Sequence, residues 1–121
     1  MQRHCVKARM VIVEGVSMYL SSDAMTTLLG QIGAILRAPK STFWMDIVDA
    51  SIISNSTGYS AVTEFCECIA TMGEPFVFGS SSPEALLREH GLTNVSRVTS
   101  ASGVHSDDPL FSLYYFITSE R

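Results

Sequence analysis

Apolar runs and helical stripes of apolar residues alternate along the chain. Runs rich in apolar and β-branched residues, typical of strands, cover residues 7–13, 42–49, 94–99 and 110–118. The first run closes on four consecutive apolar residues, 10–13, which favours a strand buried on both faces. The chain therefore predicts four strands, separated by segments with a different period.

Those segments repeat apolar residues at the three- and four-residue spacing of helices that cover a core. The first helix begins after Ser21 and ends before Pro39. Its stripe consists of Met25, Leu28, Leu29, Ile32, Ile35 and Leu36. The second stripe consists of Val62, Phe65, Cys66 and Ile69. A third helix is predicted over residues 83–90, and Gly30 and Gly33 would let the first helix pack closely on the sheet.

The element order is β-α-β-α-α-β-β, which belongs to the α/β class. Strand, helix and strand over residues 7–49 predict a right-handed parallel crossover. A polar loop, residues 101–109, joins the last two strands in place of a helix, so we expect them to pair antiparallel. The 121 residues suffice for one domain with one core. Residues 50–59 are polar and are predicted as a turn.

Acidic residues follow the first two predicted strands. Glu14 and Gly15 come directly after the first strand, and Asp46 and Asp49 lie near the carboxyl end of the second. Ligands of open parallel sheets bind outside the carboxyl ends of the strands, and a carboxylate there can accept hydrogen bonds from a ligand. The alternatives are an ordinary exposed acid at position 14 and turn-capping acids at 46 and 49. The aromatic residues Trp44 and 114–116 are interpreted as core.

Composition excludes several function classes. The net charge is −4 without a basic run, which argues against nucleic acid and anionic membranes as partners. No apolar stretch reaches the ~18 residues that cross a bilayer, and the N-terminus lacks a signal-peptide core, so we predict the cytoplasm. The three cysteines, Cys5, Cys66 and Cys68, lack zinc spacing and are predicted as free thiols, without a metal site.

Three pieces of the sequence resemble a known family. EGVSMYL at 14–20 is close to the EG-hydrophobic-x-MYL signature of the leucine carboxyl methyltransferase family of class I S-adenosylmethionine-dependent methyltransferases. Residues 43–49 are similar to the family's fifth strand. GEPFVFG at 73–79, followed by a short helix and Gly91, is similar to its GEP-x-x-FG and L-x-x-x-G pieces. The resemblance implies the C-terminal half of a Rossmann-like sheet, with parallel strands, a final antiparallel strand and flanking helices.

The resemblance also implies a function. It implies methyl transfer from S-adenosylmethionine to an oxygen of a small molecule or a carboxylate, catalysed mainly by alignment of donor and acceptor. Glu14 and Gly15 would contact the cofactor, and Met18, Tyr19 and Asp49 would line the acceptor pocket. The catalytic residues stay unassigned, because no nucleophile–base spacing is evident.

The chain departs from the family in one large respect. The glycine-rich cofactor loop and the ribose-binding acid that precede this half are absent, so residues 1–121 are interpreted as a single partial domain or inactive fragment. The first strand would then have an open apolar edge, which invites pairing with another chain. The alternative function is thus a non-catalytic interaction module that self-associates through this edge.

Overall fold

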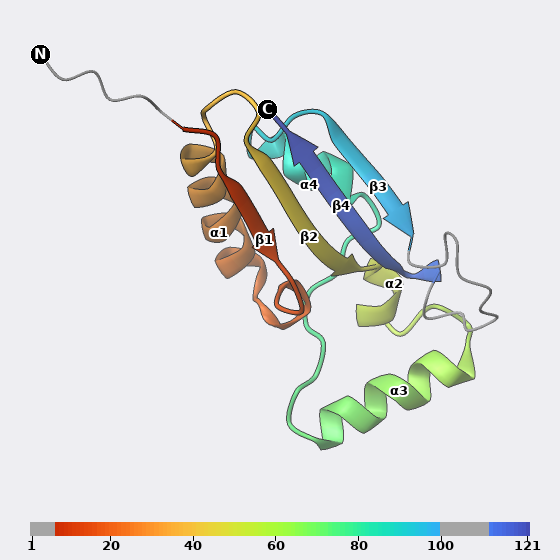
Figure 1. The fold of residues 1–121 in the computed structure, drawn as a ribbon. Helices are drawn as coiled ribbons and strands as arrows, with labels where there is room; N and C mark the ends of the chain where they lie inside the picture. Colours follow the sequence, from red (N-terminus) through yellow and green to blue (C-terminus); the bar gives the residue numbers. More distant parts are fainter. Residues whose placement is uncertain (1–6, 100–111) are drawn as a thin grey trace, which may run out of the picture.

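The computed structural model describes residues 7–99 and 112–121, which form one mixed four-stranded sheet with helices (Figure 1). The strands are β1 (Met10–Val13), β2 (Thr42–Val48), β3 (Val95–Thr99) and β4 (Tyr114–Glu120). Their spatial order is β1-β2-β4-β3. β1 is parallel to β2, and β4 is antiparallel to both of its neighbours. The predicted α/β class, the parallel first pair and the antiparallel last pair are confirmed.

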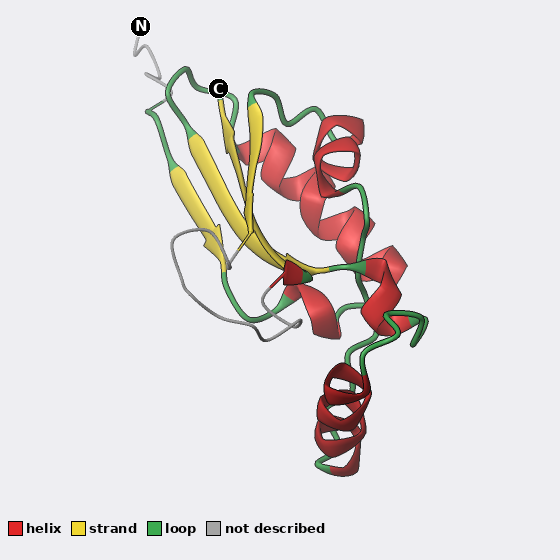
Figure 2. Ribbon diagram, turned by 90° about the vertical axis from the view of Figure 1, so that its right-hand side faces the viewer, coloured by secondary structure: helices red, strands yellow, loops and turns green. Residues whose placement is uncertain are grey.

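The helices gather on one face of the sheet and beyond its strand ends. They are η1 (Ser17–Tyr19), α1 (Ser22–Ile35), α2 (Ala50–Ile53), α3 (Ser60–Thr71) and α4 (Pro83–Glu89). α1 and α4 both contribute to the main core, and none of the described helices lies over the opposite face (Figure 2). This uneven arrangement divides the sheet into a covered face and an open face.

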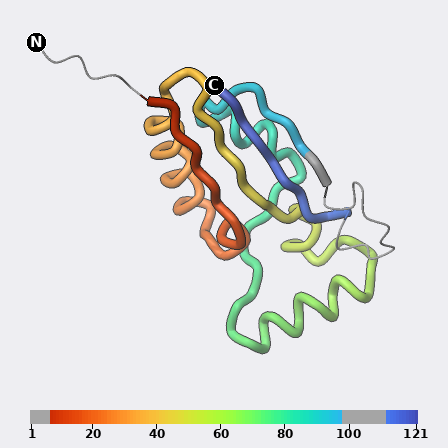
Figure 3. The backbone as a smooth tube through the Cα atoms, in the orientation of Figure 1, coloured from red at the N-terminus to blue at the C-terminus, as the bar shows by residue number. Residues whose placement is uncertain are grey.

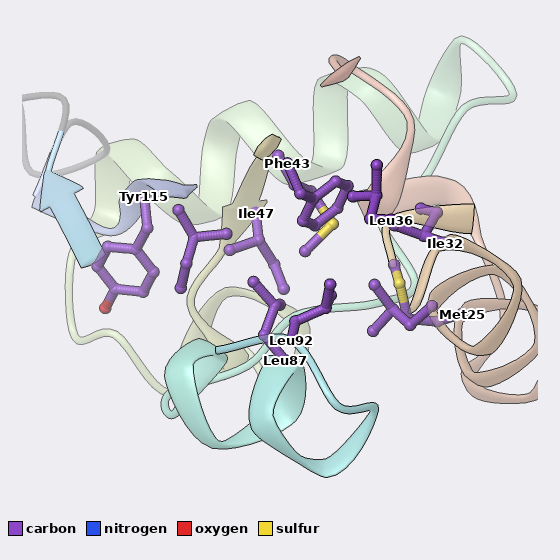
Figure 4. Close-up of a cluster of buried hydrophobic side chains, with 11 residues drawn as sticks. Met25, Ile32, Leu36, Phe43, Ile47, Leu87, Leu92 and Tyr115 are labelled. Carbon is purple, nitrogen blue, oxygen red and sulfur yellow. The ribbon is translucent and has the colours of Figure 1, made fainter. Parts of the chain in front are cut away.

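The core lies between the covered face and helices α1 and α4 (Figure 4). Every second residue of β2 and β4 points into it, and these residues are Phe43, Met45, Ile47, Tyr115 and Ile117. The helices contribute Met25, Leu29, Ile32 and Leu87, and Leu36 and Leu92 follow α1 and α4, respectively. The alternation of a strand and the stripe of a helix thus meet in one apolar layer.

The ends of α1 follow sequence rules. The Ser21 side chain accepts a hydrogen bond from the Ala24 amide at 3.1 Å, as expected for an N-cap. Gly33 is buried, and a Cβ atom there would lie 2.6 Å from the backbone oxygen of His90. The predicted close approach therefore exists, but it is to the segment after α4 and not to the sheet.

The open face shows where the sequence prediction for β1 was wrong. Met10 and Ile12 are 69% and 57% exposed, and Val11 and Val13 are half-buried against the core, so β1 is partly buried on one face and exposed on the other. An apolar run predicts two-sided burial when helices cover both faces, whereas the helices in the described part of the chain lie on one face of the sheet (Figure 2). Trp44 and Phe116 are half-buried on the open face and stack with ring centroids 5.2 Å apart, so they do not belong to the main core.

Several predicted boundaries also change. β1 is shorter than residues 7–13, because residues 7–9 are exposed and lie outside the strand. The predicted turn over 50–59 contains the short helix α2, whose N-cap is Asp49. Residues 110–111 of the predicted last strand lie outside the described residues, as do Cys5 and the loop 101–109. The strand β4 extends to Glu120, two residues beyond its predicted end.

α3 is the element least embedded in the fold. It projects from the body beyond the strand ends (Figure 1), and Val62 is its one buried residue. The tube in Figure 3 shows that the C-terminus, in contrast, lies beside the connection between α1 and β2. There the Lys40 amide donates to the Arg121 carbonyl at 2.8 Å, and the Arg121 Nε donates to the Leu36 carbonyl at 2.7 Å.

Candidate functional site

The turn after β1 is the candidate site. Gly15 has a φ angle of +68°, a left-handed conformation that glycine adopts without strain. The turn leads into η1, which is closed by a hydrogen bond from the Tyr19 amide to the Val16 carbonyl at 3.0 Å. The glycine predicted from the sequence is thus required by backbone geometry.

Asp46 of β2 holds this turn. Val13 of β1 is level with Met45 of β2, so the next residue of each strand lies at the same end of the sheet. The Gly15 amide donates to both carboxylate oxygens of Asp46, at 2.9 and 3.1 Å. The hydroxyl of Ser17 donates to the Asp46 carbonyl at 2.5 Å. Asp46 is only 1% exposed, so these contacts are sheltered from water.

Tyr114 of β4 completes the cluster by donating its hydroxyl to the Asp46 carboxylate. Burial raises the pKa of Tyr114 well above its ordinary value, and the hydrogen bond to Asp46 and the charges of Asp46 and Glu14 raise it further. The tyrosine therefore stays a neutral donor across the physiological pH range. An electrostatic interaction with Tyr19 raises the pKa of Tyr114 as well, so Asp46, Glu14 and Tyr19 all act on the same hydroxyl.

Glu14 differs from Asp46 in having no hydrogen-bonding partner within the described part of the chain. It is exposed and lines a groove of about 490 Å³ on the open face. The apolar side of the groove is formed by Met10, Ile12 and Trp44, and Glu120 also lines it. A carboxylate beside an apolar and aromatic surface can bind a group that carries an ammonium next to an apolar body.

Met18 and Tyr19 are placed by a second anchor. The amides of Val77 and Phe78 donate to the Met18 carbonyl at 2.7 and 3.2 Å. The Met18 side chain is buried in a small cluster with Val48, Ile52 and Val62. Tyr19 is exposed and packs edge-on against Phe76, with ring centroids 5.6 Å apart. Tyr19 also lines an open hollow of about 440 Å³ together with Gly73, Glu74, Pro75 and Val77.

Asp49, the third residue predicted for the acceptor pocket, is engaged in local structure. Its carboxylate accepts hydrogen bonds from the Ser51 amide at 2.9 Å, the Tyr115 hydroxyl at 2.5 Å and the Ser81 hydroxyl at 3.3 Å. Burial raises its pKa, but the hydrogen bonds outweigh burial and leave the pKa below its usual value. None of these partners lines the Glu14 groove.

The structure thus joins Glu14 and Gly15 in one turn, connects Tyr19 to it through η1, and places Met18 beneath it. The sequence interpretation missed Asp46 as the residue that holds the turn, and Tyr114 as its partner. The acidic residues near the carboxyl ends of the first two strands pointed to Asp46. Nothing in the sequence pointed to Tyr114, which lies 68 residues away from Asp46 in the chain.

Across residues 7–99 and 112–121, His, Cys, Asp and Glu side chains form no group of three that could hold a metal ion. Within the same ranges, none of the helices has the length and apolarity that crossing a bilayer requires.

Comparison with known proteins shows the fold. The sequence matches no protein-family model and no curated protein. The structure resembles human N-acetylserotonin methyltransferase in complex with SAM, with a TM-score of 0.59 and 12% identity over 93% of this chain. It also resembles an O-methyltransferase family protein from Burkholderia thailandensis, with a TM-score of 0.61 and 11% identity over 93% of this chain.

A third similar structure is a DUF574 family protein from Streptomyces avermitilis, with a TM-score of 0.59 and 13% identity over 95% of this chain. The chain spans 29%, 30% and 45% of the three longer chains, respectively. Its sheet and helices therefore resemble part of a methyltransferase Rossmann-like domain, at identities that establish the fold and no finer assignment.

Proposed function

We propose that this chain is part of an S-adenosylmethionine-dependent methyltransferase that methylates an oxygen of a small molecule or a carboxylate. Within this class we propose the leucine carboxyl methyltransferase family, on the EGVSMYL residues at 14–20. The observation that supports the proposal most is the turn after β1. It presents an exposed carboxylate, Glu14, at the carboxyl end of a parallel strand in a methyltransferase-like sheet.

The residues fit one part of such a cofactor site. The Glu14 carboxylate suits the ammonium of the methionine portion, and the apolar groove beside it suits the less polar portion. When bound, the sulfonium supplies an electrophilic methyl group. The turn would fix the ammonium end, and the hollow beside Tyr19 would position the acceptor oxygen for the transfer. An ionised carboxylate acceptor would need no separate base.

The part of the similar proteins that this chain does not span sets the scope of the proposal. We propose that the chain supplies the half of the domain after the glycine-rich loop, so that full activity belongs to a complete domain. We also keep the cytoplasm as its predicted location.

Titration calorimetry of the purified chain with S-adenosylmethionine tests the cofactor proposal. We expect measurable binding, and a dissociation constant about 10- to 100-fold higher in Glu14→Ala, because a charge-assisted contact is lost. Glu67→Ala removes an exposed carboxylate of α3 and is the matched control, with binding expected to be unchanged. Absence of binding by the unmodified chain, or equal affinity in Glu14→Ala, would contradict the proposal.

A second candidate function is self-association through the outer edge of β1, and a specific observation favours it. Among residues 7–99 and 112–121, β1 pairs with β2 and with no other strand. Its four residues are apolar, with neither charge nor proline to block an added strand. A uniformly apolar edge is complementary to itself, so the occupant that fits it is a second copy of this chain in a two-fold arrangement.

Light scattering after size exclusion tests this second candidate. We expect a dimer for the unmodified chain and a monomer for Ile12→Lys, which places a charge beside the pairing edge. Ile35→Lys changes an exposed isoleucine of α1 and should leave the dimer intact. A monomer at all concentrations would remove self-association as a candidate.

A further inference from the structure

The turn that carries Glu14 is held from two sides, and only one side involves a buried charge. On the side of η1, the Met18 carbonyl receives the amides of Val77 and Phe78. On the side of β1, the Gly15 amide is shared by the two carboxylate oxygens of Asp46, at 2.9 and 3.1 Å. Glu14 lies immediately before the second anchor, so its direction depends on the peptide that Asp46 holds.

The contacts of Asp46 account for its burial. A carboxylate that is 1% exposed is costly unless donors surround it. The Gly15 amide and the Tyr114 hydroxyl are those donors. Two strands and one turn therefore meet at a single side chain. The Ser17 hydroxyl binds the Asp46 carbonyl at 2.5 Å, so the turn is attached to this residue twice.

Asp46 itself is not available to a ligand. Its oxygens are engaged by Gly15 and Tyr114, and it does not line the groove that Glu14 lines. Glu14 has the opposite properties, because it is exposed and has no hydrogen-bonding partner in the described ranges. The two carboxylates therefore have different roles: Asp46 fixes the backbone of the turn, and Glu14 lies exposed at the groove.

We propose that Asp46 is the positioning residue of this site, holding the Gly15 peptide so that the Glu14 carboxylate faces the groove. Tyr114 is the second member of the device, because its hydroxyl fixes the orientation of the Asp46 carboxylate. The ligand class is a molecule with an ammonium group, and naming it as S-adenosylmethionine rests on the proposed function.

Two measurements on the whole chain test the proposal. The first is hydrogen exchange of the Gly15 amide by NMR, which needs no ligand. We expect exchange at least about 10-fold faster in Asp46→Ala, where the acceptor is gone, with a smaller change in Asp46→Asn, which keeps one acceptor oxygen. The second is calorimetry with S-adenosylmethionine, where affinity should fall about 10-fold or more in Asp46→Ala and partly recover in Asp46→Asn.

Matched variants separate positioning from general loss of structure. Ser41→Ala removes a buried hydroxyl that accepts a hydrogen bond from the Arg9 amide at 3.1 Å, at the other end of the sheet and outside the groove, so it should leave Gly15 exchange and affinity unchanged. Glu14→Gln should weaken binding without changing Gly15 exchange. Should Asp46→Ala fail to fold, Tyr114→Phe removes one hydroxyl and should still accelerate exchange at Gly15.

The outcomes are distinct. Unchanged Gly15 exchange in the folded Asp46 and Tyr114 variants would overturn the positioning role, as would unchanged affinity in a chain that binds S-adenosylmethionine. A chain that binds no S-adenosylmethionine would overturn the proposed function, and exchange at Gly15 would then decide the positioning role alone.

Discussion

The two faces of the sheet are built from the same strands but differ in almost every physical respect. On β2, Phe43, Met45 and Ile47 enter a closed apolar core on the covered face. The alternate residues, Trp44 and Asp46, point to the open face, where a half-buried indole and a carboxylate replace aliphatic packing. Neighbouring residues of one strand therefore serve different purposes, since one packs in the core and the next belongs to the candidate site or the open face.

This difference indicates which face of the sheet tolerates substitutions without a loss of stability. The covered face has no room for an added or unpaired polar group, because its space is filled and its atoms are screened from water. The open face keeps a groove and an exposed carboxylate, Glu14, and a hydrogen bond between Tyr114 and Asp46 links two of its strands. We therefore expect covered-face substitutions to act on unfolding and open-face substitutions to act on binding.

The largest expected effect contrasts one isoleucine on each face. Ile47→Ala removes a fully buried side chain from the core and should lower the free energy of unfolding by about 3 kcal/mol. Ile12→Ala changes a 57% exposed side chain on the open face and should cost less than about 0.5 kcal/mol. Urea unfolding of both variants measures the contrast. A similar cost at both positions would mean that the open face is packed in solution.

A smaller effect contrasts two glycines of α1. Gly33→Ala should cost about 1–3 kcal/mol, because the new Cβ would lie 2.6 Å from the His90 backbone oxygen. Gly30→Ala meets no atom within 4 Å and should stabilise the helix by about 0.5–1 kcal/mol. Thermal unfolding distinguishes the two signs, and a stabilising Gly33→Ala would refute the contact with the segment after α4.

The smallest effect concerns Asp49 and acid. Its pKa lies below the usual value, so the unfolded chain binds its proton more readily, and the stability it contributes is present above its unfolded pKa. That contribution is lost as the pH falls below the usual aspartate pKa and through the lower pKa of the folded state.

Asp49→Asn should therefore cost about 1 kcal/mol at pH 7 and flatten the acid limb of a stability–pH curve. Exchange of the Gly15 amide should be unaffected, because Asp49 hydrogen-bonds to neither Gly15 nor Asp46. If the stability of Asp49→Asn falls with acid as steeply as that of the unmodified chain, the pKa of Asp49 does not differ between the folded and unfolded states.

Local rules predicted much of the fold. The stripe of α1 follows from the spacing of its apolar residues, and its cap at Ser21 follows from a side-chain acceptor three residues before the Ala24 amide. The cap at Gly91 is local as well: its φ is +78°, and the Leu92 amide donates to the Leu87 carbonyl at 3.1 Å. The parallel pairing of β1 with β2 follows from the helix that connects them, because such a crossover brings the chain back to run in the same direction.

Long-range choices could not be predicted in this way. The insertion of β4 between β2 and β3 is decided by the sheet as a whole. The role of Asp46 depends on Tyr114, which is adjacent only after that insertion. The exposure of Met10 and Ile12 depends on which helices cover the sheet, and an apolar run carries no information on that point. For Glu14, the chain order alone placed it at a strand end.

The shallow packing of α3 has a consequence for the resistance of the protein to proteolysis. A helix with one buried side chain opens more cheaply than the sheet it accompanies, because little apolar area is exposed when it detaches. Among the helices that the structure describes, a protease should therefore cut α3, residues 60–71, first. The strands and the turn at Gly15 should survive that cut, because the β1–β2 ladder and the hydrogen bonds of Asp46 do not involve α3. The packing of Met18 against Val62 is the contact that they would lose.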